Sequence, residues 1–138
     1  MRRLVLDASV ALAWFIDHPV PAYALRVEQV LADGGRAVVP ALWHLEVANG
    51  FVVAERRGAI SAGDTMQALH KLELLLIQSI ESIPAPLSLR RVLASARQFR
   101  LTAYDACYLE LARDMQLPLA TLDRQLANAA KQDGILLT

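Results

Sequence analysis

The chain has 138 residues, of which 55% are hydrophobic and 20% are charged. These proportions exclude a disordered chain, and the length predicts a single domain over residues 1–138 that can fold without disulfides. The 14 Lys and Arg residues balance the 14 Asp and Glu residues, so net charge provides no general attraction to nucleic acid. A polyanionic partner would have to be met by local Arg clusters or bound cations.

Two features bear on the cellular compartment. The single cysteine, Cys107, cannot form an internal disulfide, and we expect it to pack in the core. No apolar run reaches the length of a membrane span, and Asp7 interrupts the N-terminal apolar stretch that would otherwise suggest a signal peptide. The sequence therefore predicts a soluble cytoplasmic protein.

Short apolar runs alternate with helical patterns along the chain. We expect strands at the β-prone runs, which are residues 3–6, 36–39, 77–83, 117–121 and 134–137. We expect helices over residues 8–16, 21–32, 42–57, 62–76, 89–99, 103–115 and 124–131. This alternation predicts an α/β three-layer sandwich, with a parallel sheet covered by helices on both faces.

The stretch that begins at Thr102 predicts the start of a helix. Thr102 is placed to cap it, and Asp105, three residues later, fits a capping box. An apolar stripe at helical spacing should follow, formed by Tyr104, Cys107, Tyr108, Leu111 and Met115. The segment from Ser61 to Asp64 has the same cap spacing without chemical groups near it, so what distinguishes Asp105 must lie elsewhere in the chain.

Four acids are expected at one edge of the predicted sheet. Asp7 ends the first strand, and Glu46 lies in the first turns of the helix after the second. Asp105 opens the helix that leads into the fourth strand, and Asp123 follows that strand. Ligands of open parallel sheets bind beyond the carboxyl ends of the strands. Four acids there, with no Lys beside them, predict one or two divalent cations with oxygen ligands, Mg²⁺ or Mn²⁺.

Each acid also has an ordinary explanation. Asp7 and Asp123 fit N-caps of the helices that follow them, and Glu46 fits a solvated helix position. Four coincident caps or surface positions at one sheet edge explain the pattern less well than a metal site does. The three histidines show no zinc-ligand spacing, which argues against Zn²⁺.

Three polar residues are expected to support the carboxylates. Ser9 lies two residues after Asp7, Thr121 lies two before Asp123, and Asn49 lies three after Glu46 on the same helix face. Each is placed to orient a carboxylate or to hold water. Local helix caps explain Ser9 and Thr121 equally well.

These motifs resemble a known family. The segments that carry the resemblance are Leu6-Asp7-Ala8-Ser9, Glu46-Val47-Ala48-Asn49, Tyr104-Asp105-Ala106-Cys107-Tyr108-Leu109-Glu110-Leu111-Ala112 and Thr121-Leu122-Asp123. Their order is similar to that of PIN-domain ribonucleases, and within these to VapC-type toxins of toxin–antitoxin pairs. The resemblance covers nearly the whole chain, and no acid of the pattern is missing.

The resemblance implies a fold, an activity and partners. It implies a five-stranded parallel sheet in the order 3-2-1-4-5, a homodimer, and a small antitoxin that blocks the active site. It also implies a Mg²⁺- or Mn²⁺-dependent endoribonuclease, in which a cation activates water and neutralises charge on the phosphate. The catalytic and metal-binding residues would be Asp7, Glu46, Asp105 and Asp123.

Arginines are the candidates for holding RNA. They are Arg56, Arg57, Arg97, Arg100 and Arg124. For each of them, solvated surface charge is the alternative explanation. Aromatic residues make up only 6% of the chain, so stacking on bases cannot be the main source of RNA affinity.

Other functions fit the motifs less well. A haloacid-dehalogenase-like phosphatase would need Asp-x-Asp after the first strand, where this chain has Asp7-Ala8-Ser9. A receiver domain would need a Lys after a late strand, and residues 117–121 contain none. A nucleotide-binding module would need a Gly-rich turn after the first strand. The remaining alternative is a catalytically silent PIN fold that binds RNA or protein, for which missing acids would be expected.

Overall fold

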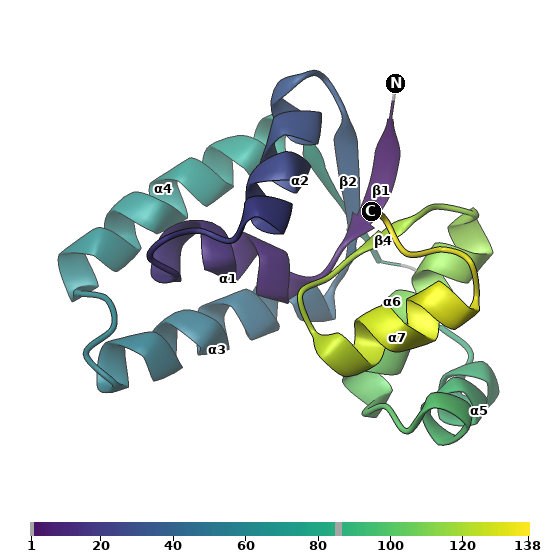
Figure 1. The fold of residues 1–138 in the computed structure, drawn as a ribbon. Coiled ribbons are helices and arrows are strands. Elements are labelled where there is room, and N and C mark those ends of the chain that lie inside the picture. The colour runs from purple at the N-terminus through teal and green to yellow at the C-terminus, as the bar shows by residue number, and fades with distance from the viewer. Residues whose placement is uncertain (1, 85–86) are drawn as a thin grey trace.

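The computed structural model describes residues 2–84 and 87–138, in which strands alternate with helices (Figure 1). The strands are β1 (Arg3–Leu6), β2 (Arg36–Pro40), β3 (Ile80–Ile83) and β4 (Leu119–Ala120). The helices are α1 (Ala8–Ile16), α2 (Ala22–Ala32), α3 (Leu42–Arg56), α4 (Ala62–Gln78), α5 (Leu89–Phe99), α6 (Ala103–Met115) and α7 (Arg124–Gln132). None of the helices in these ranges is both long and apolar enough to cross a membrane.

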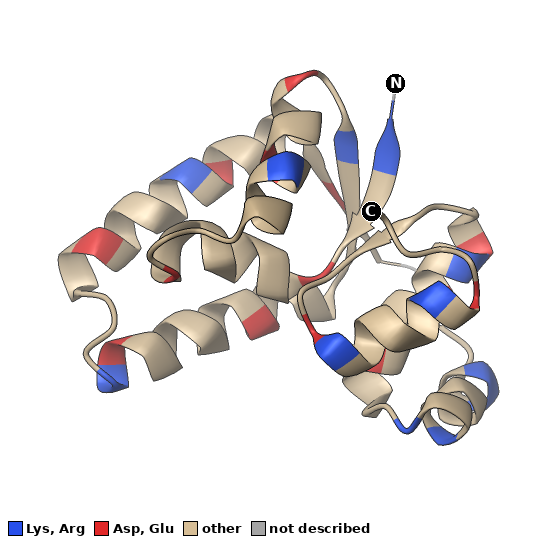
Figure 2. Cartoon of the chain, in the orientation of Figure 1, with Lys and Arg blue, Asp and Glu red and all other residues tan. Residues whose placement is uncertain are grey.

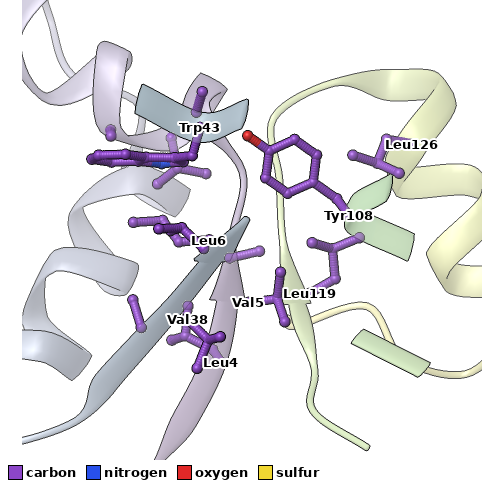
Figure 3. Packing of buried hydrophobic residues seen from close by; sticks show 14 of the residues in the cluster. Leu4, Val5, Leu6, Val38, Trp43, Tyr108, Leu119 and Leu126 are labelled. Atoms are coloured by element: carbon purple, nitrogen blue, oxygen red, sulfur yellow. The ribbon is translucent and has the colours of Figure 1, made fainter. Parts of the chain in front are cut away.

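The strands form a parallel sheet with helices on both sides, which confirms the predicted α/β class. α6 packs against β1, β2 and β4 and is itself covered by α5 and α7. Figure 1 shows α1 to α4 together on the other side of the strands. The centre of the sheet is apolar because Leu4, Val5 and Leu6 of β1 are at most 1% exposed (Figure 3).

The predicted number of strands is wrong. Over the described residues the sheet has four strands in the order β3-β2-β1-β4, instead of five in the order 3-2-1-4-5. The segment expected as a last strand, residues 134–137, makes one isolated parallel bridge between Leu136 and Leu119. The N–H of Leu119 donates to the Ile135 carbonyl at 2.7 Å, and the Leu119 carbonyl accepts from the N–H of Leu137 at 2.8 Å.

The shortness of β4 explains why this bridge does not extend into a strand. Alternate residues of a strand bond to the same neighbour, so the next pairing positions would be Leu117 and Thr121. Both lie outside β4, which spans only Leu119–Ala120. The N–H of Leu117 is already used by the carbonyl of Ala112 at the end of α6. The fourth strand is therefore shorter than the predicted 117–121, and a fifth cannot form beside it.

Two other local predictions are also wrong. The third strand begins at Ile80 rather than at residue 77, because α4 continues through Gln78 and leaves Ile77 78% exposed. Tyr104 does not belong to a buried stripe, since it is 65% exposed. It shares a helix face with Tyr108, but burial on that face begins only one turn later, at Tyr108 itself.

A buried group of charges, hereafter the Glu110 ion cluster, joins α5, α6 and α7. Glu110 is 3% exposed and accepts hydrogen bonds from Arg113 at 2.8 Å and from the Ser95 hydroxyl at 3.1 Å. Arg91 approaches its other oxygen at 3.3 Å, and Arg113 also pairs with Asp133. This carboxylate is thus neutralised by two guanidinium groups.

Candidate active site

The structure brings the four predicted acids to one place. Asp7, Glu46, Asp105 and Asp123 line a single cavity of about 260 Å³, hereafter the carboxylate cavity. Asp7 follows β1, Glu46 lies in the first turns of α3, and the two others stand at the starts of α6 and α7. Figure 2 shows acidic segments directly after β1 and directly before α7, between the two groups of helices. The cavity therefore lies beyond the carboxyl ends of the parallel strands.

Asp7 is held by two hydroxyls rather than used as a helix cap. It is 4% exposed, and its Oδ2 accepts from Ser9 Oγ at 2.6 Å and from Thr121 Oγ1 at 2.8 Å. These hydroxyls accept in turn from the backbone N–H groups of Leu122 and Asp123, each at 3.0 Å. Asp7 makes no side-chain cap to α1, so the cap explanation is wrong for this residue.

Asp123 is a cap and a cavity residue at once. Its Oδ1 accepts from the N–H of Leu126 at 2.8 Å, as expected for the N-cap of α7. The carboxylate still lines the carboxylate cavity. Thr102 caps α6 as predicted, since its hydroxyl accepts from the N–H of Asp105 at 3.1 Å.

Glu46 is anchored by a residue whose role the sequence did not reveal. The hydroxyl of Tyr108 donates to Glu46 Oε1 at 2.5 Å. Tyr108 is completely buried, and this burial raises the pKa of its phenol, so the group stays protonated as a donor. The apolar spacing predicted only packing for Tyr108. A buried phenol needs a hydrogen-bond partner, and this requirement is the signal that could have pointed to a polar role.

The carboxylates perturb one another. Burial raises the pKa of Asp7 and of Glu46. The pKa of Asp105 rises to about 6, first through burial and then through the negative charges of Asp123, Asp7 and Glu46. Every ion pair in the described ranges joins other residues, so no Lys or Arg there neutralises this cavity.

The donor set fits a hard divalent cation, because it consists of carboxylate oxygens with hydroxyl support. Among residues 2–84 and 87–138, however, no three His, Cys, Asp or Glu side chains already stand in an arrangement that could hold a metal ion. Uncompensated carboxylates repel one another. The residues present therefore fit a cation in chemical type, and their side chains would have to rotate to bring the oxygens together.

The remaining predicted residues differ in how near they lie to the carboxylate cavity. Asn49 is exposed and lines the carboxylate cavity. Arg124 begins α7 directly after Asp123, and Arg100 ends α5 two residues before the Thr102 cap. Both arginines are exposed, on segments that lead to the cavity.

The other three arginines lie farther along their helices. Arg56 and Arg57 stand at the end of α3, ten residues after Glu46, which corresponds to about 15 Å along the axis. Arg97 lies in the last turn of α5. All three are exposed, and the structure does not bring Arg56 and Arg57 to the cavity.

Comparisons with known proteins agree with this arrangement. The PIN domain pattern matches residues 4–132. Ribonuclease VapC3 from Pyrobaculum aerophilum is 30% identical over 129 residues, which cover 91% of this chain and 92% of that protein. The crystal structure of PAE2754, also from Pyrobaculum aerophilum, superposes with a TM-score of 0.71 at 22% identity, covering 99% of this chain and 88% of that one.

A more distant structure shares the fold as well. A domain of a functionally unknown protein from Methanocaldococcus jannaschii gives a TM-score of 0.53 at 15% identity, covering 99% of this chain and 89% of that one. At these identities the two structures show the fold alone, whereas the sequence matches extend over nearly the whole chain. The chain therefore belongs to the PIN-domain family and is a relative of its VapC-type members.

Proposed function

We propose that this chain is a divalent-cation-dependent endoribonuclease that acts as the toxin of a toxin–antitoxin pair. The observation that carries the proposal is the carboxylate cavity, in which four acids meet without a Lys or Arg counter-ion from the described residues. So much uncompensated charge is unfavourable unless cations complete the site. The name of the relative, Ribonuclease VapC3, supports RNA as the substrate.

The reaction that these residues support is hydrolysis of a phosphodiester bond. The four carboxylates would hold one or two Mg²⁺ or Mn²⁺ ions, whose Lewis acidity acts on water and on the phosphate. Ser9 and Thr121 fix the Asp7 carboxylate through one oxygen, and the cap to Leu126 fixes Asp123 in the same way. No histidine lines the cavity within the described residues, so the carboxylates carry the chemistry.

Arginines beside the cavity would hold the RNA backbone. Arg100 and Arg124 are exposed on the segments that lead to Asp105 and Asp123. Phosphate contacts of this kind give affinity without reading sequence. We assign these two arginines to the RNA phosphates nearest the cleaved bond, and Arg56, Arg57 and Arg97 to more distant contacts.

The partners follow from the same site. We propose that an extended segment of a small antitoxin crosses the carboxylate cavity and presents an Arg to the acids, because a guanidinium group pairs well with carboxylates. We also propose that the chain forms a homodimer, as the family resemblance implies. A complex in which the partner leaves the acids open would contradict the first of these assignments.

The proposal is tested with the purified chain and RNA. Cleavage should require Mg²⁺ or Mn²⁺ and stop with EDTA, and expression of the chain alone should arrest growth until the cognate antitoxin is co-expressed. Cleavage that survives chelation, or that needs Zn²⁺, would overturn the cation assignment. RNA binding without cleavage in any divalent cation would favour the silent interaction module instead.

A further inference from the structure

The contact between Tyr108 and Glu46 joins two distant parts of the chain at the carboxylate cavity. The Tyr108 ring packs in the core with no exposed surface, while Glu46 is half-buried and lines the cavity. Figure 3 shows the ring near Leu126, with its hydroxyl directed toward the helix that carries Trp43, which is α3. The 2.5 Å bond to Glu46 Oε1 is the hydrogen bond that this hydroxyl donates.

Three of the four acids of the cavity, all except Asp105, share a pattern of support. Asp7 accepts both of its hydroxyl bonds on Oδ2, and Asp123 accepts its cap bond on Oδ1. Glu46 likewise accepts from Tyr108 on Oε1. In each case one oxygen is held by the protein, and the hydrogen bonds of the described residues leave the second oxygen of the same carboxylate for a ligand.

Glu46 needs such a support more than the aspartates do. A glutamate side chain has one more rotatable bond than an aspartate, and ordering it has a larger entropic cost. α3 offers no backbone cap to this carboxylate, since Glu46 lies inside the helix. An immobile donor from another element is therefore the means by which the side chain is kept in the cavity.

α6 supplies that donor together with a cavity acid. Asp105 and Tyr108 are three residues apart on α6, so they lie on neighbouring positions of one helix face. The same helix packs against β1, β2 and β4. Because the ring of Tyr108 is fixed by the core, the position of its hydroxyl is set by the same packing that sets Asp105.

We infer that Tyr108 is a positioning residue, whose buried hydroxyl anchors one oxygen of Glu46 and so keeps this carboxylate at the carboxylate cavity, where it would help to bind a cation. The inference rests on the proposed function, because it assigns Glu46 to a cation. Tyr108 touches neither the cation nor the RNA, and it acts through Glu46.

The test is a calorimetric titration of the full chain with Mn²⁺, in the absence of RNA. Tyr108→Phe removes the hydroxyl and keeps the ring, and we expect the Mn²⁺ dissociation constant to rise by about 10–100-fold, the effect usual for partners that orient metal ligands. Tyr23→Phe is the matched control. Tyr23 is half-buried and donates to the Leu137 carbonyl at 2.6 Å, and it lines a different cavity.

A double-mutant cycle separates positioning from general packing. In a Glu46→Ala background, Tyr108→Phe should change Mn²⁺ affinity by less than about twofold, because the group through which it acts is gone. An affinity loss of equal size in both backgrounds, or a Tyr108→Phe variant that binds Mn²⁺ like the wild type, would overturn this inference alone. A wild-type chain that binds no Mn²⁺ would overturn the proposed function and this inference together.

Discussion

Asp7 and Glu110 are equally buried carboxylates that the chain treats in opposite ways. Asp7 is 4% exposed and Glu110 is 3% exposed. Glu110 is paired with Arg91 and Arg113, whereas Asp7 is held by the hydroxyls of Ser9 and Thr121. Hydroxyls fix the position of a carboxylate without cancelling its charge.

The difference indicates that Glu110 serves the folded structure, whereas Asp7 belongs to the candidate active site. In the Glu110 ion cluster, which joins α5, α6 and α7, every carboxylate is paired with a guanidinium group of the protein. The carboxylate cavity keeps its charges unbalanced, and the pKa of Asp105 is raised to about 6 in part by the other three acids. Uncompensated burial lowers stability, so its persistence at one sheet edge marks the place where a ligand is expected. Substitutions in the carboxylate cavity should therefore affect cleavage and cation binding, whereas substitutions in the Glu110 ion cluster should affect the stability of the fold.

The largest expected effect is on cleavage. Asp7→Asn keeps the shape of the side chain and removes one charge. RNA cleavage should fall more than about 100-fold. Replacing residues that only orient a metal ligand already lowers activity or metal affinity by about 10–100-fold. Without cation, the melting temperature should stay the same or rise, because repulsion is relieved. A variant that cleaves normally but melts much lower would place Asp7 with Glu110 as a structural acid.

Cation binding at the carboxylate cavity should stabilise the folded protein, and this gain should not depend on the Glu110 ion cluster. At one hundred times its dissociation constant, a ligand stabilises a protein by about 2.7 kcal/mol. We expect Mg²⁺ or Mn²⁺ to stabilise the wild type by about this free energy, seen as a higher melting temperature, and to stabilise Asp105→Asn much less. Thermal melts with and without EDTA measure both. If the cation still stabilised Asp105→Asn as much as the wild type, Asp105 would serve only the start of α6.

Glu110→Gln should lower the stability of the fold and leave RNA cleavage unchanged. It removes the charge that Arg91 and Arg113 share, while Asp114 and Asp133 remain as their other partners. We expect a loss of about 1–3 kcal/mol in the free energy of unfolding. This is less than the 3–5 kcal/mol for a fully buried pair, because the two Arg side chains are 54% and 28% exposed. Urea unfolding measures the loss. Cleavage per folded molecule should be retained, and its disappearance would contradict the separation of the two sites.

The smallest effect is on the pH dependence of stability without cation. Asp105 binds its proton more tightly in the folded chain, with a pKa of about 6, than at its ordinary value of 3.8. Between these values the folded state binds more protons, so the free energy of unfolding should fall as pH rises from 3.8 to about 6. The fall should be modest because Asp105 is half-exposed.

Asp64 provides the control for this pH effect. Ser61 caps α4 through the N–H of Asp64 at 3.0 Å, as Thr102 caps α6 through Asp105 at 3.1 Å. Asp64 is exposed and does not line the carboxylate cavity. Melts in EDTA across this pH range should be flatter for Asp105→Asn than for the wild type, and unchanged for Asp64→Asn. Equal changes in both variants would show that the cap, and not the cavity, sets the pH dependence.

Sequence patterns predicted what is local or periodic. β1 and α1 begin and end where the apolar runs predicted, and the caps at Thr102 and Asp123 form as expected. The meeting of the acids could be predicted because the carboxyl ends of parallel strands share one edge.

What could not be predicted depends on partners distant in sequence. The bond from Tyr108 to Glu46 spans 62 residues, and no spacing rule reports such a pair. The burial of Glu110 depends on Arg91 from α5, a partner that the spacing of residues along α6 does not indicate. The missing fifth strand was hidden for the same kind of reason, because the N–H of Leu117 turns back to α6.

The central place of β1 in the sheet also determines when the carboxylate cavity of a newly made chain can assemble. β1 pairs with β4, with the N–H of Val5 donating to Pro118 and that of Asp7 donating to Ala120. Asp7 therefore receives the Thr121 hydroxyl only after more than a hundred further residues have been synthesised. A ribosome that stops before residue 118 releases a fragment with three of the four acids and no assembled site. The order of the strands thus delays the appearance of a complete site until the segment from β4 to Asp123 has been synthesised.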